Sequence, residues 1–309
     1  MIQRQGPSPL YYEASPRNRP TLRVEPGEMF EVVTQMNVGP DLSVVPPDLW
    51  DDWTRYHSYE IERPNPSSGA IWVEGAELGH AVEVVIEDME LAPVGYSAFR
   101  GDNYLFPKTP VTDRDLIAAR VVRIRDSHVI WEEGLALPVR PMVGMVAVAP
   151  AHESQSTVRV QKWGGNMDIQ DLGPGARVQL AVNVPGALVH IGDVHALQGD
   201  GEIAGSAVET SALIRLRVEL TERPEEMTWP RIVTPERVMT VGSGRPAERA
   251  FRIAASELVR WLHADYGLSP AEAVLLLGQV VEARATQVVN PTIPYVASVR
   301  HEILKGLRR

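Results

Sequence analysis

The chain has 309 residues, of which 44% are hydrophobic and 23% are charged, and its formal net charge is -10 at pH 7. These values predict a globular protein with a sizeable core, and the negative charge argues against nucleic acid or an anionic membrane as its main partner. The absence of cysteine excludes disulfides, cysteine-ligated zinc and thiolate nucleophiles.

No apolar run reaches the ~18 residues that a membrane-spanning helix needs. The N-terminal region, with Gln3, Arg4 and Gln5, lacks the apolar segment of a signal peptide. The sequence therefore predicts a cytoplasmic protein without a membrane partner.

Glycine turns followed by β-branched strands recur along the first two thirds of the chain. In one of them Val82, Val84 and Ile86 alternate with Glu83 and Glu87, which is the period of a half-buried strand. Strands are predicted at residues 29–33, 81–86, 117–125, 142–149, 177–180, 186–197, 202–209 and 211–220.

Residues 40–66 form an irregular stretch that carries Trp50, Trp53, Tyr56 and Tyr59. Such a long aromatic loop is typical of a lid or a subunit contact, and equally of a loop held by its own aromatic side chains.

Two helices are predicted near the C-terminus. Residues 247–266 place apolar side chains at helical spacing and end at Gly267. Ser269, Pro270 and Glu272 then form the start of a second helix, with an N-cap, a proline at the first helical position and a capping-box glutamate. We therefore predict a mainly β (α+β) chain divided into an N-terminal β-rich part (1–150), a central β part (151–235) and a C-terminal helical part (236–309).

The candidate site lies in a predicted hairpin around residues 192–202. Asp193 and His195 are two residues apart on a strand, so their side chains leave on the same face, whereas His190 points the other way. If the turn is centred between Gly199 and Asp200, Glu202 joins them, although a shift of one residue sends it to the other face. An imidazole with two carboxylates suits a divalent metal with an open water position, and the alternative is a turn held by Asp and Gly for conformational reasons.

A second polar motif precedes the hairpin, at residues 164–168. Its adjacent glycines allow backbone amides to approach a small ligand, and the Asn166 side chain is a further donor for an oxyanion. Turn glycines followed by a hydrogen-bonded Asn give the same pattern. The chain has no phosphate-binding Walker loop and no nucleophile elbow.

The chain carries a series of motifs, spread from about residue 20 to 300, that occur in the same order in a known protein family. They lie at residues 65–69, 73–77, 141–145, 164–168, 185–188, 192–195, 198–202 and 286–291. On these motifs the sequence resembles the acetamidase/formamidase family of metal-associated small-amide hydrolases.

The resemblance implies a β-sandwich portion with a second β-rich portion, hydrolysis of a linear amide to a carboxylate and ammonia, and a homo-oligomer of two or more subunits. The resemblance also implies which positions of this sequence correspond to the family's functional residues, with Glu74 and Glu77 as possible supporting residues. The central members are Asn166, Asp168, Asp193, His195, Gln198, Asp200 and Glu202.

One departure concerns Trp163, which stands where the family commonly has a histidine. If that histidine is a ligand or a base, this chain has a different coordination shell, another substrate or no activity.

Our hypothesis from the sequence assigns a role to each candidate. Asp193 and His195 bind the metal, with zinc expected and calcium as the alternative, and Glu202 is the base that takes a proton from water. Asn166 stabilises the oxyanion and Asp168 orients His195 or the substrate nitrogen. Substrate contacts are assigned to Gly165, Gln198 and Asp200.

Two other functions stay open at this point. One is hydrolysis of a bulkier amide or a ureido compound, and the other is a catalytically inactive family member that serves as an oligomeric binding protein.

Overall fold

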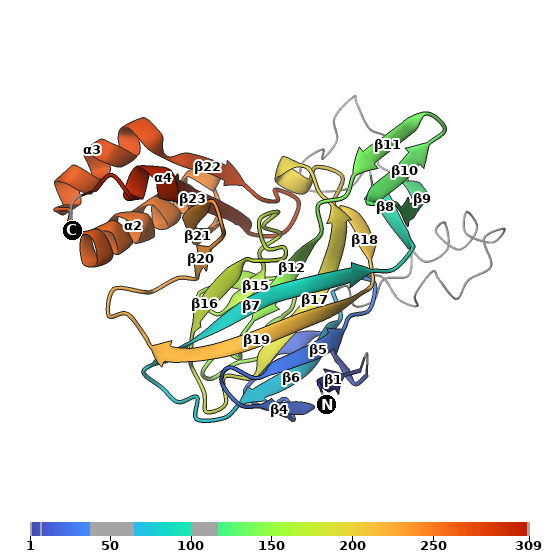
Figure 1. Ribbon diagram of the computed structural model, residues 1–309, viewed down its shortest axis with the longest axis horizontal. Helices are drawn as coiled ribbons and strands as arrows, with labels where there is room; N and C mark the ends of the chain where they lie inside the picture. Colours follow the sequence, from blue (N-terminus) through green and yellow to red (C-terminus); the bar gives the residue numbers. More distant parts are fainter. Residues whose placement is uncertain (1, 7, 38–64, 101–116, 308–309) are drawn as a thin grey trace.

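The computed structural model describes residues 2–6, 8–37, 65–100 and 117–307. The aromatic loop with Trp50, Trp53, Tyr56 and Tyr59 lies outside the described residues. Two large sheets and a C-terminal group of helices make up the described part (Figure 1).

The first sheet has nine strands, in the order β1-β5-β19-β7-β16-β20-β21-β23-β22. Their bounds are β1 Gln3–Gln5, β5 Met29–Val33, β7 His80–Leu91, β16 Arg177–Ala181, β19 Ala212–Glu222, β20 Arg231–Val233, β21 Arg237–Gly244, β22 Glu282–Ala285 and β23 Ile293–Arg300. Strands from all three predicted parts of the chain share this sheet, and the division into those parts stays a prediction.

The second sheet has twelve strands, with β11-β10-β9-β8-β18-β17-β12-β15-β14 in order and β6, β2 and β4 joined to it beside β17. Their bounds are β2 Leu10–Tyr11, β4 Leu22–Val24, β6 Ser67–Val73, β8 Val94–Arg100, β9 Ile117–Arg125, β10 His128–Glu132, β11 Leu135–Pro138, β12 Met142–Ala147, β14 Val160–Gln161, β15 Gly164–Asn166, β17 Val189–Leu197 and β18 Val208–Thr210. A separate pair consists of β3 Glu13–Ala14 and β13 Gln155–Ser156.

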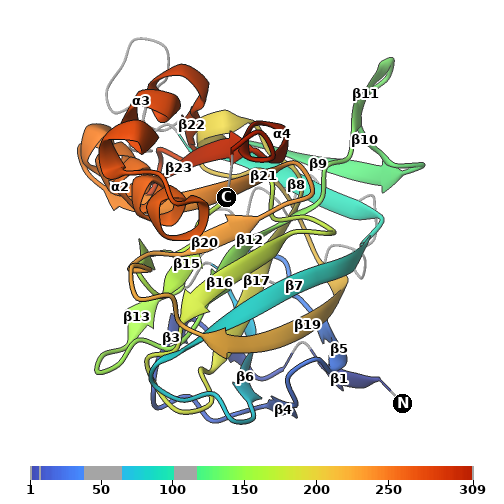
Figure 2. The same cartoon turned by 60° about the vertical axis from the view of Figure 1, so that its left-hand side comes forward.

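The two sheets pack face to face around one hydrophobic core (Figures 1 and 2). Phe30, Val84 and Leu216 contribute to it from the first sheet, and Val143 and Ile191 from the second. The alternation seen in the sequence explains this, because every second residue of β7 faces the core. The predicted sandwich portion of a mainly β chain is confirmed.

The C-terminal helices cover one end of the first sheet (Figures 1 and 2). Helix α2 (Ala247–Tyr266) ends at Gly267, whose φ is 70°, and α3 (Pro270–Val280) begins with the capping box of Ser269 and Glu272. The short α4 (His301–Leu304) follows β23. Ala254, Leu258 and Leu262 of α2 pack with residues of β21 and β23, which confirms the predicted helix pair. Phe251 of α2 and Leu275 of α3, which share the apolar pattern, are exposed.

Most predicted strands are present, and the segment 202–209 is the exception. Only its end, from Val208, belongs to a strand, and Asp200–Glu202 form a short 3-10 helix, η3. Gly201 and Gly205, with φ of 80° and 87°, let the chain fold back before β18 begins. Within the described ranges, no helix is long and apolar enough to cross a bilayer.

Candidate functional site

The candidate site crosses five adjacent strands of the second sheet, β8-β18-β17-β12-β15. Tyr96 of β8 pairs with Glu209 of β18, which in turn pairs with His195 of β17. Directly opposed residues of antiparallel strands project on the same face of the sheet, so these three side chains form a row.

His195 lies at the centre of this row, fully buried between carboxylates. Its Nε2 atom is 3.4 Å from Asp193 Oδ1 and 3.2 Å from Glu209 Oε2. The other oxygen of Glu209 accepts a hydrogen bond from the Ala207 backbone N–H at 3.0 Å. The structure thus brings Asp193 and His195 together, as their spacing predicts.

Gln198 orients the His195 ring. The Gln198 Nε2 group donates to the backbone carbonyls of Asp168 and Thr286, so its Oε1 atom, 2.8 Å from His195 Nδ1, is an acceptor. Nδ1 therefore carries a proton, and Nε2 is directed at the carboxylates. An imidazole held in this way is able to bind a metal ion through Nε2.

Asn166 and Asn65 hold the two aspartates. The Asn166 Nδ2 group donates to Asp168 Oδ2 at 2.8 Å, and its Oδ1 accepts from Asn65 Nδ2 at 2.6 Å. Asn65 Nδ2 also donates to Asp193 Oδ2 at 3.1 Å. One oxygen of each aspartate is thereby fixed, and the other is left for the site.

Gly144 of β12 provides the space for these carboxylates. A Cβ atom at this position would lie 2.7 Å from Asp193 Oδ2 and 2.8 Å from Asp168 Oδ1. Because real side chains do not approach so closely, only glycine fits here.

The backbone is strained at the same place. Asn65, Asp168, Asp193 and Glu202 have positive φ angles, between 46° and 58°, in the left-handed region that non-glycine residues avoid. They are four of the eight non-glycine residues with positive φ in the described part of the chain. Such strain concentrates at functional sites.

Several ligand atoms converge here without a hydrogen-bond partner. Four buried atoms have no hydrogen-bond partner among the residues that the structure describes: Asp168 Oδ1, Asp193 Oδ1, His195 Nε2 and Glu209 Oε2. Two overlapping groups, Asp168-Asp193-His195 and His195-Glu202-Glu209, each offer ligand atoms within 4.8 Å of one another. Buried carboxylates need a positive partner, so this donor set fits a divalent cation.

The protonation of the site reflects its burial and its charge. Burial, with the neighbouring Glu202 and Asp193, raises the pKa of Asp168 well above its usual value. Burial, against the opposing effect of His195, raises the pKa of Glu202 to about 8. Burial alone would lower the pKa of His195, but Glu209 and Asp193 raise it well above its ordinary range. The four carboxyl groups around one imidazole thus repel one another when they are ionised.

The predicted hairpin register is wrong. It would place Glu202 opposite Leu197, on the same sheet face as His195, whereas Val208 pairs with Leu197 and Glu209 pairs with His195. The reason is that η3 and the turn after it separate β17 from β18. Glu202 nevertheless reaches the cluster from η3, where its backbone N–H donates to the Gly199 carbonyl at 3.1 Å.

The three residues predicted to contact the substrate lie in different surroundings. Asp200 is largely exposed and pairs with Arg284 at 3.3 Å, and Gln198 is engaged with His195. Gly165 is packed against β14, where a Cβ atom would lie 1.8 Å from the Arg159 carbonyl oxygen. Gln198 therefore supports the site, Asp200 bonds to Arg284 at the surface, and Gly165 is required by strand packing.

The suggested supporting residues Glu74 and Glu77 are outside the cluster. Glu74 accepts from Arg23 and from the Trp72 indole, and Glu77 is exposed beside His80. His190 is also separate, bound to Asn18 and Ser67.

Sequence reasoning missed Glu209, Asn65 and Tyr96. A glutamate inside the apolar run from Ala207 to Thr210 was the signal for Glu209, because a buried strand rarely carries an unpaired acid. Asn65 begins the motif at residues 65–69. Its contact with Asn166 could not be predicted from that motif, because the two residues are 101 positions apart in the sequence. Nothing in the local sequence distinguishes Tyr96 from a core aromatic.

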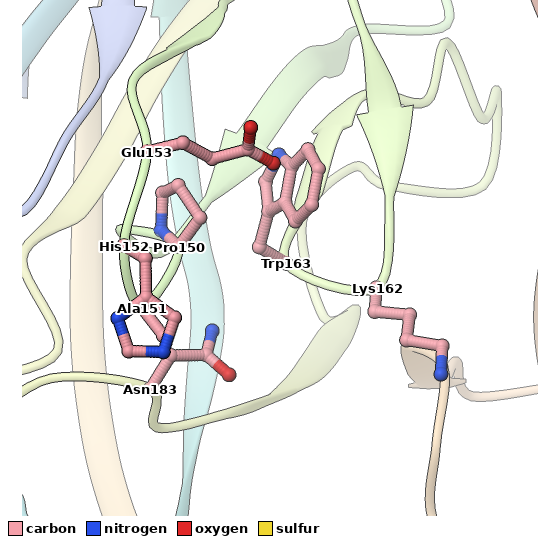
Figure 3. Close-up of a pocket in the computed structure, with 7 residues that line it drawn as sticks. All are labelled: Pro150, Ala151, His152, Glu153, Lys162, Trp163 and Asn183. Atoms are coloured by element: carbon pink, nitrogen blue, oxygen red, sulfur yellow. The ribbon is translucent and has the colours of Figure 1, made fainter.

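Trp163 lies away from the cluster. It packs on Ala14, Met145 and Ala147 and lines a separate pocket of about 390 Å³. Figure 3 shows the Trp163 ring beside Pro150 and Glu153, with Lys162 directed away. The full lining is Pro150, Ala151, His152, Glu153, Lys162, Trp163 and Asn183, which includes no residue of the cluster.

Comparison with known proteins gives consistent matches. Residues 125–304 match a model of the acetamidase/formamidase family. The crystal structure of a predicted acetamidase/formamidase from Thermoanaerobacter tengcongensis is 30% identical with a TM-score of 0.87, covering 100% of this chain and 99% of that one. For an acetamidase from Yersinia enterocolitica the identity is 32%, the TM-score 0.86 and the coverage 98% and 93%.

Among curated relatives, the acetamidase of Mycolicibacterium smegmatis is 38% identical over 78 residues, which are 25% of this chain and 19% of that protein. The matched segment thus spans about a fifth of this relative's length. With a family model covering more than half of its residues and a solved relative aligned over all of them, the chain belongs to the acetamidase/formamidase family.

Proposed function

We propose that this protein hydrolyses a small linear amide, such as formamide or acetamide, to a carboxylate and ammonia. The observation that carries the proposal is the pair of overlapping groups Asp168-Asp193-His195 and His195-Glu202-Glu209, each with ligand atoms within 4.8 Å of one another. Among the described residues, four of the buried ligand atoms have no hydrogen-bond partner: Asp168 Oδ1, Asp193 Oδ1, His195 Nε2 and Glu209 Oε2. Family membership supports the same reaction class.

A divalent cation is the cofactor that this donor set suits. Asp168, Asp193, His195 and Glu209 would hold it, so the ligand set is larger than Asp193 and His195 alone. When bound, the cation polarises a carbonyl group and makes water more acidic. An imidazole among carboxylates favours zinc, and calcium is the alternative because oxygen donors predominate.

Glu202 is the proposed general base. Its carboxylate reaches the cluster beside His195 and Glu209, where a base can accept a proton from water. It takes a proton from the attacking water as the C–O bond forms, and delivers a proton to the nitrogen as the C–N bond breaks. The products are then a carboxylic acid and ammonia.

Asn166 and Gln198 act as positioning residues. Asn166 is already bonded to Asp168 and Asn65, so we assign it to holding those groups rather than to the oxyanion. Gln198 keeps the Nε2 atom of His195 directed at the cluster.

The test is ammonia release by the purified protein from formamide, acetamide, a bulkier amide and urea, together with its metal content by mass spectrometry. We expect a divalent metal in the protein and activity on the small amides. Preference for the bulkier amide or urea would support the second substrate class, and a folded, metal-free protein without ammonia release would contradict the proposal.

His195→Ala should abolish both metal binding and ammonia release, because it removes the central ligand. The matched control is His263→Ala on α2, which lies outside the site and should retain both. A His195→Ala variant that keeps its metal would remove His195 from the ligand set.

The implied homo-oligomer is a separate proposal. Light scattering after size-exclusion chromatography should give a mass of at least twice 34.1 kDa. A monomeric mass at working concentration would contradict it.

A further inference from the structure

Tyr96 stands at the end of the row that contains Glu209 and His195. Its direct pairing with Glu209 on the neighbouring strand places the phenol on the same face of the sheet as the cluster. The ring packs with Met36 and Val94, which leaves its position well defined.

The hydroxyl of Tyr96 is buried and has no hydrogen-bond partner among the residues that the structure describes. The residue as a whole is 2% exposed. A buried hydroxyl without a partner destabilises a fold, and a phenylalanine would fill the same space without this cost. An unpaired hydroxyl beside a catalytic cluster therefore points to a ligand.

The other side-chain groups of the site indicate what that ligand offers. Four carboxylates can only accept hydrogen bonds when ionised, both N–H groups of the Asn65 amide are used, and one of the two N–H groups of Asn166 is used by Asp168. His195 Nδ1 is bonded to Gln198. Hydrolysis of an amide builds negative charge on the carbonyl oxygen, which a hydrogen-bond donor stabilises in addition to a cation.

We propose that Tyr96 is a catalytic residue whose hydroxyl donates a hydrogen bond to the carbonyl oxygen of the amide substrate. This inference rests on the proposed amide hydrolysis. The bond strengthens as charge develops on that oxygen, so it stabilises the transition state more than the bound substrate.

The test compares the metal-loaded wild type with Tyr96→Phe, using formamide or acetamide as substrate. We expect kcat to fall about 100-fold or more, with KM changed by less than about threefold. Metal content should be unchanged. The melting temperature should be unchanged or higher, because the variant lacks an unpaired buried hydroxyl.

Tyr295→Phe is the control, since it makes the same chemical change on β23, where the ring contacts Phe251. It should leave kcat, metal content and melting temperature unchanged. A Tyr96→Phe protein with wild-type kcat would overturn the assignment. So would a loss of metal or a lower melting temperature, because either would identify the hydroxyl as structural.

The two proposals fail in different ways. A wild type that releases no ammonia from any amide removes both of them. An active wild type with an equally active Tyr96→Phe variant removes only the role of Tyr96.

Discussion

At the scale of single residues, the site depends on side chains that orient other side chains. Gln198 fixes the His195 ring through a 2.8 Å contact with Nδ1, while its own amide nitrogen is held by two backbone carbonyls. Losing such an outer contact typically reduces metal affinity about 10- to 100-fold.

Gln198→Leu should therefore weaken metal binding by roughly that factor, as measured by competition with a chelator. Gln179→Leu is the control, because Gln179 contacts Glu83 on the first sheet, away from the site. Equal affinities of the two variants would show that Gln198 does not position His195.

The substitution Gly144→Ala tests the effect of adding one Cβ atom at the site. The added Cβ would collide with Asp193 Oδ2 and Asp168 Oδ1, so both carboxylates must move. We expect loss of bound metal, measured by mass spectrometry. Gly278→Ala meets no atom within 4 Å and should retain the metal, and retention by both variants would contradict the geometry.

The buried side chain of His190 should make the free energy of unfolding depend on pH. Burial lowers its pKa to about 4, and it is held neutral by accepting from Asn18 Nδ2 and donating to Ser67 Oγ. The unfolded chain takes up this proton near pH 6.5, so this contribution to stability is complete above pH 6.5. It falls by roughly 3 kcal/mol as the pH drops towards 4.

Urea denaturation between pH 4 and 7 measures this effect. In His190→Gln the contribution should be missing, so the difference from the wild type should shrink as the pH falls. A constant difference would show that His190 titrates normally.

At the scale of elements, helix α3 is stabilised locally and contributes nothing to the cluster. The Ser269 hydroxyl accepts from the Glu272 backbone N–H, and the Glu272 carboxylate accepts from the Ser269 N–H. Ser269→Ala should lower the free energy of unfolding by about 1 kcal/mol and leave kcat unchanged. Denaturation and ammonia release measure the two effects, and an altered kcat would indicate that α3 is coupled to the site.

The connection from β17 to β18 shows how a short element can decide which residues lie opposite each other on two strands. The sequence spacing predicts a tight turn that places Glu202 opposite Leu197, on the same face as His195. In the structure η3 occupies that segment, Val208 lies opposite Leu197 and Glu209 lies opposite His195. Alternation along a strand is a local property, whereas the register between strands depends on the length of the turn.

At the scale of the whole molecule, metal binding should stabilise the fold. Removal of the cation by a chelator leaves four buried carboxyl groups around one imidazole, and their repulsion opposes folding. For a metal present at about a thousand times its Kd, the loss is about 4 kcal/mol. The melting temperature should fall and recover when metal is added back, and no change on verified removal would contradict the cation site.

The chain's own order of residues determined the β class, the capped helix pair and the polar motifs, because alternation, helical spacing and capping are properties of neighbours in sequence. Only the tertiary structure decided which polar residues meet. Asn65, Tyr96, Asn166 and Glu209 come from four different strands or strand ends, and their convergence with His195 depends on strand pairing over long separations. Strand order is set by packing of the whole core, so no local pattern could place these side chains around one buried point.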